Sequence, residues 1–178
     1  MAMLRWLILI SASLLLSGCF ISETLLFSPA DADLPLADGT VLITYALDDA
    51  GKRKDEPPSR LVVERKEQSY IFKPDGDGPF RAIFDDMGNG YFVAAELDVA
   101  SDTGPQYGLV HQVGESWFAY TVTCSDFEAL IKKQKKLADF HIKKSGSQCR
   151  FTSYDDVKNA LMFIADNTKP NMELIAEK

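Results

Sequence analysis

Several features of enzymes, nucleic-acid-binding proteins and membrane-spanning proteins are missing from this sequence of 178 residues. It has only two histidines, His111 and His141, and no Gly-x-Ser-x-Gly motif, so it does not predict a Ser-His-Asp type of catalytic site. The apolar stretch from Trp6 to Leu16 has 11 residues, whereas a transmembrane helix needs roughly 20. Basic side chains are outnumbered by acidic ones, 19 to 26, and an acidic surface repels nucleic acid. We therefore expect no nucleic-acid partner and no catalytic role for either histidine.

The apolar stretch ends in a short motif, Leu16-Ser17-Gly18-Cys19, and follows a single basic residue, Arg5. This arrangement resembles the lipobox of bacterial lipoprotein precursors. The resemblance implies that residues 1–18 are a cleaved signal peptide. It also implies that Cys19 becomes the first mature residue, with diacylglycerol on its thiol and an N-acyl lipid on its amino group. An ordinary secretory signal would be removed as well, but it would leave Cys19 unexplained. We expect no cofactor beyond this covalent lipid.

Phe20, rather than Asp, follows the lipobox cysteine. In lipoproteins of enteric-type bacteria an Asp at that position is the usual signal for retention in the inner membrane. The resemblance therefore implies a lipid-anchored protein of the outer membrane that faces the periplasm. The mature chain has 18 basic and 26 acidic side chains, a net charge of −8, and is repelled by an anionic membrane surface. The lipid must then supply most of the anchoring, which two or more acyl chains can do.

Two cysteines, Cys124 and Cys149, remain once Cys19 is acylated. An exported chain meets an oxidising compartment, where an even pair of cysteines most simply forms a disulfide. A metal-binding pair and a catalytic thiol are the alternatives. Neither cysteine lies in a C-x-x-C motif or has a histidine at ligand spacing. The sequence therefore predicts a Cys124–Cys149 disulfide and no metal site.

The mature chain reads as a short tether over residues 19–39 and a single globular α+β domain over residues 40–178. From Thr40 to Val122, about seven runs of β-branched and aromatic residues are separated by turn signals such as Asn89-Gly90. This pattern predicts an antiparallel β-meander, either as an open twisted sheet or as a partly closed barrel. Short strands near residues 139–143 and 147–151 are also expected.

Two C-terminal helices are predicted to cover this sheet. The first begins at a capping box formed by Ser125 and Glu128, and the second begins at Thr152 or Ser153 and ends near Asn167. The apolar stripe of the second helix comprises Val157, Ala160, Leu161 and Ile164. Cys124 and Cys149 each lie just before a helix, so their disulfide would tie the starts of the two helices to the sheet.

The densest group of charges is a basic stretch near the first helix, made up of Lys132, Lys133, Lys135, Lys136, Lys143, Lys144 and Arg150. Its simpler interpretation is a solvent-exposed helix face, because residues 111–178 as a whole carry 10 basic and 9 acidic side chains, a net charge of +1. The alternative is a contact site for an anionic envelope polymer or lipid headgroup.

Two groups of acidic residues could form a calcium site or a catalytic carboxylate pair, but the sequence favours simpler structural roles for both. Asp75 and Asp77 match the start of a calcium loop, but Gly78 and Pro79 stand where further ligands are needed, so a turn is predicted. Carboxylate pairs on either side of Asn89-Gly90 could serve glycosidic chemistry, although on hairpin arms they are more often solvated strand edges. These pairs are Asp85 with Asp86 and Glu96 with Asp98.

These observations favour a non-enzymatic, membrane-anchored envelope lipoprotein that acts as a binding or accessory module for an envelope protein or polymer. The first alternative is an inhibitor of a basic hydrolase such as a lysozyme. It rests on the excess of acid in residues 20–110, which have 8 basic and 17 acidic side chains. The second alternative is a hydrolase with an unrecognised site on the sheet.

Overall fold

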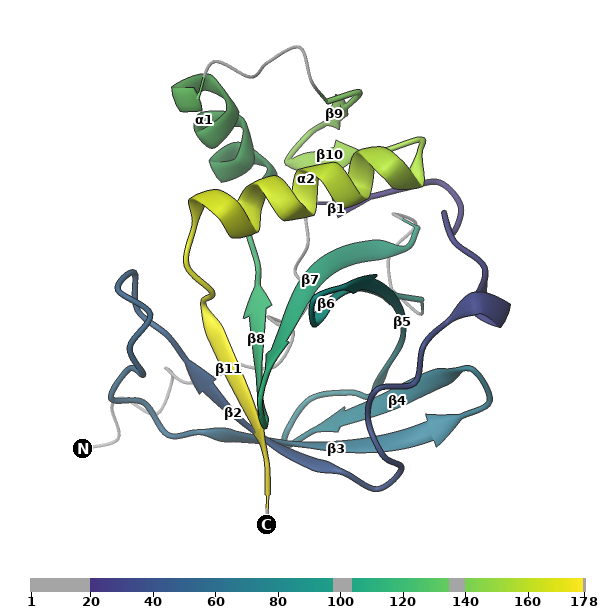
Figure 1. The fold of residues 1–178 in the computed structure, drawn as a ribbon, viewed down its shortest axis with the longest axis vertical. Coiled ribbons are helices and arrows are strands. Elements are labelled where there is room, and N and C mark those ends of the chain that lie inside the picture. The colour runs from purple at the N-terminus through teal and green to yellow at the C-terminus, as the bar shows by residue number, and fades with distance from the viewer. Residues whose placement is uncertain (1–19, 98–103, 135–139, 178) are drawn as a thin grey trace, which may run out of the picture.

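Eight antiparallel strands close into a barrel in the computed structural model, which describes residues 20–97, 104–134 and 140–177 (Figure 1). In barrel order they are β6 (Tyr91–Glu96), β5 (Phe80–Gly88), β4 (Ser69–Pro74), β3 (Ser59–Lys66), β2 (Val41–Ala46), β11 (Met172–Ala176), β8 (Ser116–Tyr120) and β7 (Gln106–Val113). Pairing between β6 and β7 closes the ring. The predicted α+β meander is confirmed, and of its two forms the structure has the barrel.

The barrel contains one strand that the sequence did not predict. β11 lies between β2 and β8, pairs antiparallel with both, and buries Met172 and Leu174. It has only five residues, which follow the second helix and Pro170, so the alternation of its side chains is too short to stand out. β11 therefore bridges the gap between β2 and β8, the two strands that would otherwise not be connected in the barrel.

The hairpin between β5 and β6 forms as predicted, with Asn89 and Gly90 at φ angles of 55° and 78°. Positive φ at both central residues is what a two-residue type I′ turn requires. Gly90 has a second reason to be glycine, because a Cβ there would lie 2.6 Å from the carbonyl oxygen of Gln112. This hairpin therefore packs directly against the end of β7.

Two apolar clusters lie on opposite faces of the barrel wall. The inner cluster fills the barrel and includes Leu61, Tyr70, Phe72, Phe92, Trp117 and Leu174. The outer cluster lies between the wall and the helices and includes Ile83, Val93, Tyr107, Leu109, Phe127, Leu161 and Ile164. Alternate residues of β5, β6 and β7 thus face the two clusters, so these strands are apolar on both faces and show no simple alternation of apolar and polar residues.

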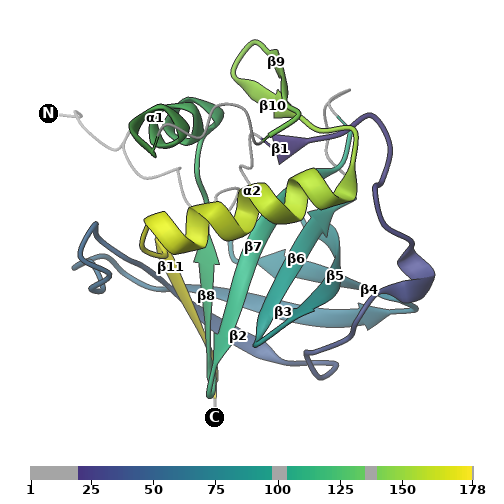
Figure 2. The same ribbon diagram turned by 45° about the horizontal axis from the view of Figure 1, so that its top comes forward.

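The two helices pack at one end and along one side of the barrel (Figures 1 and 2). α2 (Tyr154–Asn167) runs across the barrel wall and buries the predicted stripe, and Ser153 caps its first turn by accepting a hydrogen bond from the Asp156 amide at 3.2 Å. α1 (Cys124–Gln134) starts two residues earlier than a helix capped by Ser125 would. Its cap is Thr123, whose hydroxyl accepts from the Asp126 amide at 3.1 Å, and not Ser125.

The prediction of a tether over residues 19–39 is wrong for the described residues 20–39, which fold against the domain. β1 (Phe20–Ile21) pairs in parallel with β10 (Gln148–Arg150), which in turn pairs with β9 (Lys143–Ser145). A 3-10 turn spans Pro29–Asp31, and the chain beyond it places Leu36 in the inner cluster. The buried residues of this segment are a run of three, Phe20–Ser22, and the single Leu36, so a periodicity criterion could not detect them.

Close backbone contact holds the start of this segment in place. Ser22 donates its backbone N–H to the Pro105 carbonyl at 3.3 Å, and Gly104, at a φ of 77°, passes so close that a Cβ would lie 2.1 Å from the Ser22 carbonyl oxygen. The buried Tyr107 hydroxyl is 2.9 Å from the Ser22 hydroxyl and accepts the Leu26 amide at 2.9 Å. The N-terminal segment is therefore part of the folded domain.

Candidate functional site

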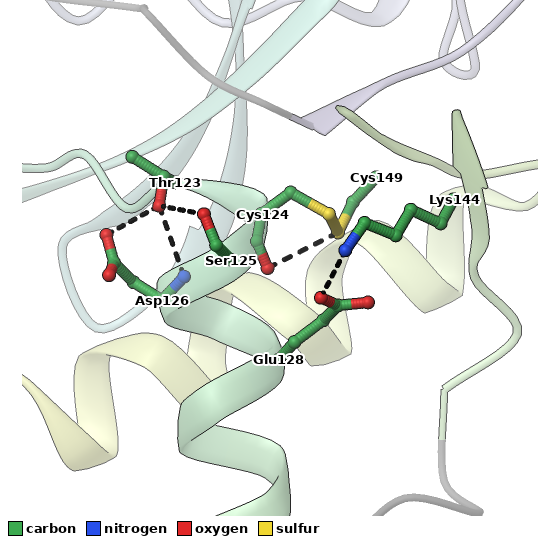
Figure 3. Close-up of a disulfide and its surroundings, with 7 residues drawn as sticks. All are labelled: Thr123, Cys124, Ser125, Asp126, Glu128, Lys144 and Cys149. Carbon is green, nitrogen blue, oxygen red and sulfur yellow. Dashed lines mark hydrogen bonds and ion pairs between the residues drawn. A yellow bond between two sulfur atoms is a disulfide. The ribbon is translucent and has the colours of Figure 1, made fainter. Parts of the chain in front are cut away.

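Cys124 and Cys149 form a disulfide, as the sequence predicted (Figure 3). Both residues are fully buried, and their Cα atoms are 5.3 Å apart. The bond joins the first residue of α1 to the middle of β10. Because both sulfur atoms are used in it, the metal-binding and catalytic-thiol alternatives do not apply to this oxidised form.

The disulfide lies beside strand β1. Cys149 is the partner of Phe20 in the parallel ladder, and the Phe20 ring packs 4.9 Å from the ring of Phe127 on α1 and 5.0 Å from that of Phe151. Phe20 is 2% exposed. The chain immediately after Cys19 is therefore held by strand pairing with β10 and by ring contacts with Phe127 and Phe151, beside a disulfide that joins α1 to β10. Cys19 itself lies outside the described residues.

Most residues of the predicted basic stretch lie on α1, β9 and β10, the elements around β1 and the disulfide. Lys132 and Lys133 are exposed on α1, Lys143 and Lys144 are exposed on β9, and Arg150 is on β10. Lys135 and Lys136 lie outside the described residues.

Two carboxylates bind to this basic group. Lys144 Nζ lies 2.7 Å from Glu128 on α1, and this ion pair lowers the pKa of the Glu128 carboxyl (Figure 3). Arg150 lies 3.6 Å from Glu23. The sequence correctly predicted exposure of these lysines, but not that α1, β9 and β10 bring them together around β1.

A second feature is a groove between the β5–β6 hairpin and α2, with a volume of about 460 Å³. Pockets that bind small molecules are typically ≈ 300–1,000 Å³. The hairpin side is lined by Met87, Gly88, Asn89 and Tyr91, and the helix side by Asp155, Lys158, Asn159 and Met162. The lining combines flexible apolar methionines with amide and charged groups, a mixture suited to a partner with one apolar and several polar groups.

Ring stacking and hydrogen bonds position the two walls of this groove. The Tyr91 ring stacks on His111 with centroids 3.8 Å apart and an interplanar angle of 7°. At the start of α2, Tyr154 donates a hydrogen bond to Asp85 at 2.6 Å, and burial together with this bond raises the pKa of the Tyr154 hydroxyl. Lys158 lies 4.7 Å from the Tyr154 ring and 2.9 Å from Asp155. These contacts fix α2 relative to the hairpin, so the groove is preformed.

The barrel interior contains a further cavity of about 50 Å³, lined by apolar side chains that include Leu36, Phe72 and Trp117. This volume is far below that of ordinary ligand pockets. On the same inward face, the Thr44 hydroxyl is buried and has no hydrogen-bond partner within the described parts of the chain. The interior is therefore a packed core in which small gaps remain, and the groove is the better binding site.

The remaining predicted site residues take structural positions. His141 pairs with Asp156 at 3.2 Å, and Asp75 and Asp77 lie in the turn between β4 and β5, as expected. Asp85 does not lie on a solvated strand edge, since its carboxylate accepts the hydrogen bond from Tyr154 described above.

Asp86 accepts a hydrogen bond from the Gly88 amide at 2.6 Å, and Asp98 lies outside the described residues. Within residues 20–97, 104–134 and 140–177, no three His, Cys, Asp or Glu side chains are placed to hold a metal ion.

Comparison with protein-family models, with curated proteins and with solved structures finds no match to this chain. None of the helices in the described part of the chain is long and apolar enough to cross a membrane. The features that bear on function are the Leu16-Ser17-Gly18-Cys19 motif, the groove and the basic surface.

Proposed function

We propose that the mature protein is a lipid-anchored, non-enzymatic binding module of the bacterial envelope, and that it holds its partner in the groove between the β5–β6 hairpin and α2. The lipobox at Leu16–Cys19 supports export and anchoring in the outer membrane. The observation that carries the binding role is the groove itself, about 460 Å³ in volume and lined by Met87 and Met162 among amide and charged side chains.

The lining indicates the chemistry of the partner. The two methionines accept an apolar side chain of variable shape, because the thioether is polarisable and the side chain unbranched. Asn89 and Asn159 can each donate and accept hydrogen bonds, and Lys158 and Asp155 provide one charge of each sign at the rim. A segment of an envelope protein that presents an apolar side chain between backbone amides fits these groups.

A photo-reactive amino acid in place of Met162, in cells that produce the full protein, tests this proposal. We expect it to cross-link to one defined partner, which should bind again when the two purified proteins are mixed. Asn159→Arg would fill the groove and remove the cross-link. Gln68→Arg, a matched change of an exposed amide in the β3–β4 turn, should leave it intact.

A second photo-reactive residue at Asp166 provides the specificity control, because it is exposed on the same helix and does not line the groove. Capture of the same proteins from both positions would overturn the proposal. A basic hydrolase captured at Met162 and inhibited by the purified protein would identify the module as an inhibitor.

A further inference from the structure

The site of lipid attachment lies next to a rigid part of the fold. Phe20 is buried, paired with β10 and packed on α1, and it directly follows Cys19 in the sequence. Consecutive Cα atoms are about 3.8 Å apart across a trans peptide bond. A lipid on Cys19 would therefore start within about one residue's length of β1, with no flexible spacer between the bilayer and the domain.

The elements around β1 occupy one end of the molecule. In both views α1, β9, β10 and β1 gather at the end opposite the C-terminus, with the barrel extending away from them (Figures 1 and 2). Ile21 is paired with Arg150, which is in turn paired with Lys143 of β9. The attachment point and the basic side chains therefore share this end, here called the anchor face and defined by Lys132, Lys133, Lys143, Lys144 and Arg150.

The charge of this end contrasts with that of the protein. The five basic side chains of the anchor face are accompanied by two carboxylates, Glu128 and Glu23, for a net charge of +3, whereas the whole chain has a net charge of −7. Glu128 and Glu23 are each already bound to one of the basic side chains. Lys132, Lys133 and Lys143 are exposed. An anionic surface held close to this face would be attracted to it, although the protein as a whole is acidic.

We propose that the anchor face docks on anionic phospholipid headgroups and so fixes the orientation of the domain on the membrane. The proposal rests on the lipid anchor of the proposed function. The acyl chains hold the protein at the bilayer, and the lysines select which end faces it. Phospholipid is the occupant because the short attachment brings the bilayer surface, rather than a distant polymer, to this face.

Lysine footprinting of the full acylated protein tests the orientation. The protein is placed in vesicles of phosphatidylethanolamine and phosphatidylglycerol, in vesicles of phosphatidylcholine, and in detergent, then acetylated briefly and analysed by mass spectrometry. Each lysine at an anionic surface should contribute about a fivefold preference for the docked orientation. Lys132, Lys133, Lys143 and Lys144 should therefore react at least about fivefold more slowly in the anionic vesicles than in detergent.

Internal controls come from Lys52, Lys54, Lys66 and Lys73, which are exposed outside the anchor face. They should react equally in all three samples. Protection of the anchor face should weaken in phosphatidylcholine. It should also weaken when salt is raised from about 0.1 M to about 1 M, because the Debye length falls from about 10 Å to about 3 Å.

Flotation of the same vesicles separates this proposal from the anchor on which it rests. Protein that floats with the vesicles but shows equal labelling of all lysines would overturn the docking proposal and leave the anchor standing. Protein that does not float would refute both. Protection that appears only when an anionic cell-wall polymer is added would assign the anchor face to that polymer, and would overturn the assignment to phospholipid.

Discussion

Tyr154 donates a hydrogen bond of 2.6 Å to Asp85, and this bond joins the first turn of α2 to the second half of β5. The two residues are 69 positions apart in the chain, and both are partly buried. Asp85 belongs to a pair that the sequence placed on a solvated hairpin arm. Its contact with α2 gives it a structural role, and it fixes one wall of the groove.

Removing the Tyr154 hydroxyl should destabilise the protein. Tyr154→Phe leaves the half-buried Asp85 carboxylate without this donor, so we expect the free energy of unfolding to fall by about 1–3 kcal/mol. Urea denaturation measures the change. Asp85→Asn keeps an acceptor and should cost less. Equal stability of wild type and Tyr154→Phe would show that the bond contributes nothing.

Stability should also fall at alkaline pH. The pKa of Tyr154 is raised by burial and by Asp85, and burial also raises the pKa values of Tyr70, Tyr107 and Tyr120. The folded state therefore keeps these protons longer than the unfolded state, in which tyrosine titrates near pH ~10. The contribution is complete below that pH and is lost as pH rises above it. Unfolding measured from pH 9 to 11 should show a shallower decline in Tyr154→Phe than in wild type.

The disulfide should contribute to stability. It closes a loop between residues 25 positions apart, so the double substitution Cys124→Ala with Cys149→Ala should lower the free energy of unfolding by roughly 2–4 kcal/mol. Thiol titration of denatured, non-reduced protein from the envelope should detect no reactive thiol. Two reactive thiols there would show that the bond does not form in the cell.

Substitution of Phe20 tests whether the N-terminal segment is folded against the domain or is a flexible tether. Phe20→Ala removes a buried ring from contact with Phe127 and Phe151, and we expect a loss of about 3–5 kcal/mol. Asp31→Ala, in the exposed 3-10 turn of the same segment, should change stability by less than about 0.5 kcal/mol. Chemical denaturation of the purified mature chain measures both. If Phe20→Ala is as stable as Asp31→Ala, the segment is not part of the folded unit.

Cys19→Ser should abolish acylation, because the hydroxyl cannot replace the thiol that accepts the diacylglycerol in lipoprotein precursors. The variant should remain unprocessed or soluble. Incorporation of labelled palmitate measures this directly, and Ser17→Ala, which keeps a small residue in the motif, should still be labelled. Label on Cys19→Ser equal to that on wild type would refute the lipobox interpretation.

Local features of this fold could be predicted from the sequence. The Asn89-Gly90 turn, the Ser153 cap and the stripe of α2 each depend on residues within one turn or one helix, and all three form as expected. The cysteine pairing could also be predicted, because export and an even count leave one partner for each. The capping box at Ser125 did not form because Thr123, two residues earlier, caps the helix by accepting a hydrogen bond from the Asp126 amide.

The remaining features depend on contacts between distant segments. β1 and β11 are too short to show a period, and their existence depends on β10, β2 and β8 being in place. The groove is lined by both Met87 and Met162, which are 75 positions apart in the sequence. No local pattern in the sequence connects these two methionines, so their common position could not be predicted.

The position of β11 affects the order of folding. Met172–Ala176 follow every other strand in the sequence, yet they separate β2 from β8 in the barrel. Until these last residues have been added to the chain, the edges of β2 and β8 that β11 occupies have no partner strand, and such edges are sites of intermolecular pairing. Pairing β2 with β11 also closes a loop of well over 100 residues, which favours slow folding. We therefore expect the protein to be most prone to aggregation before β11 has paired and the barrel has closed.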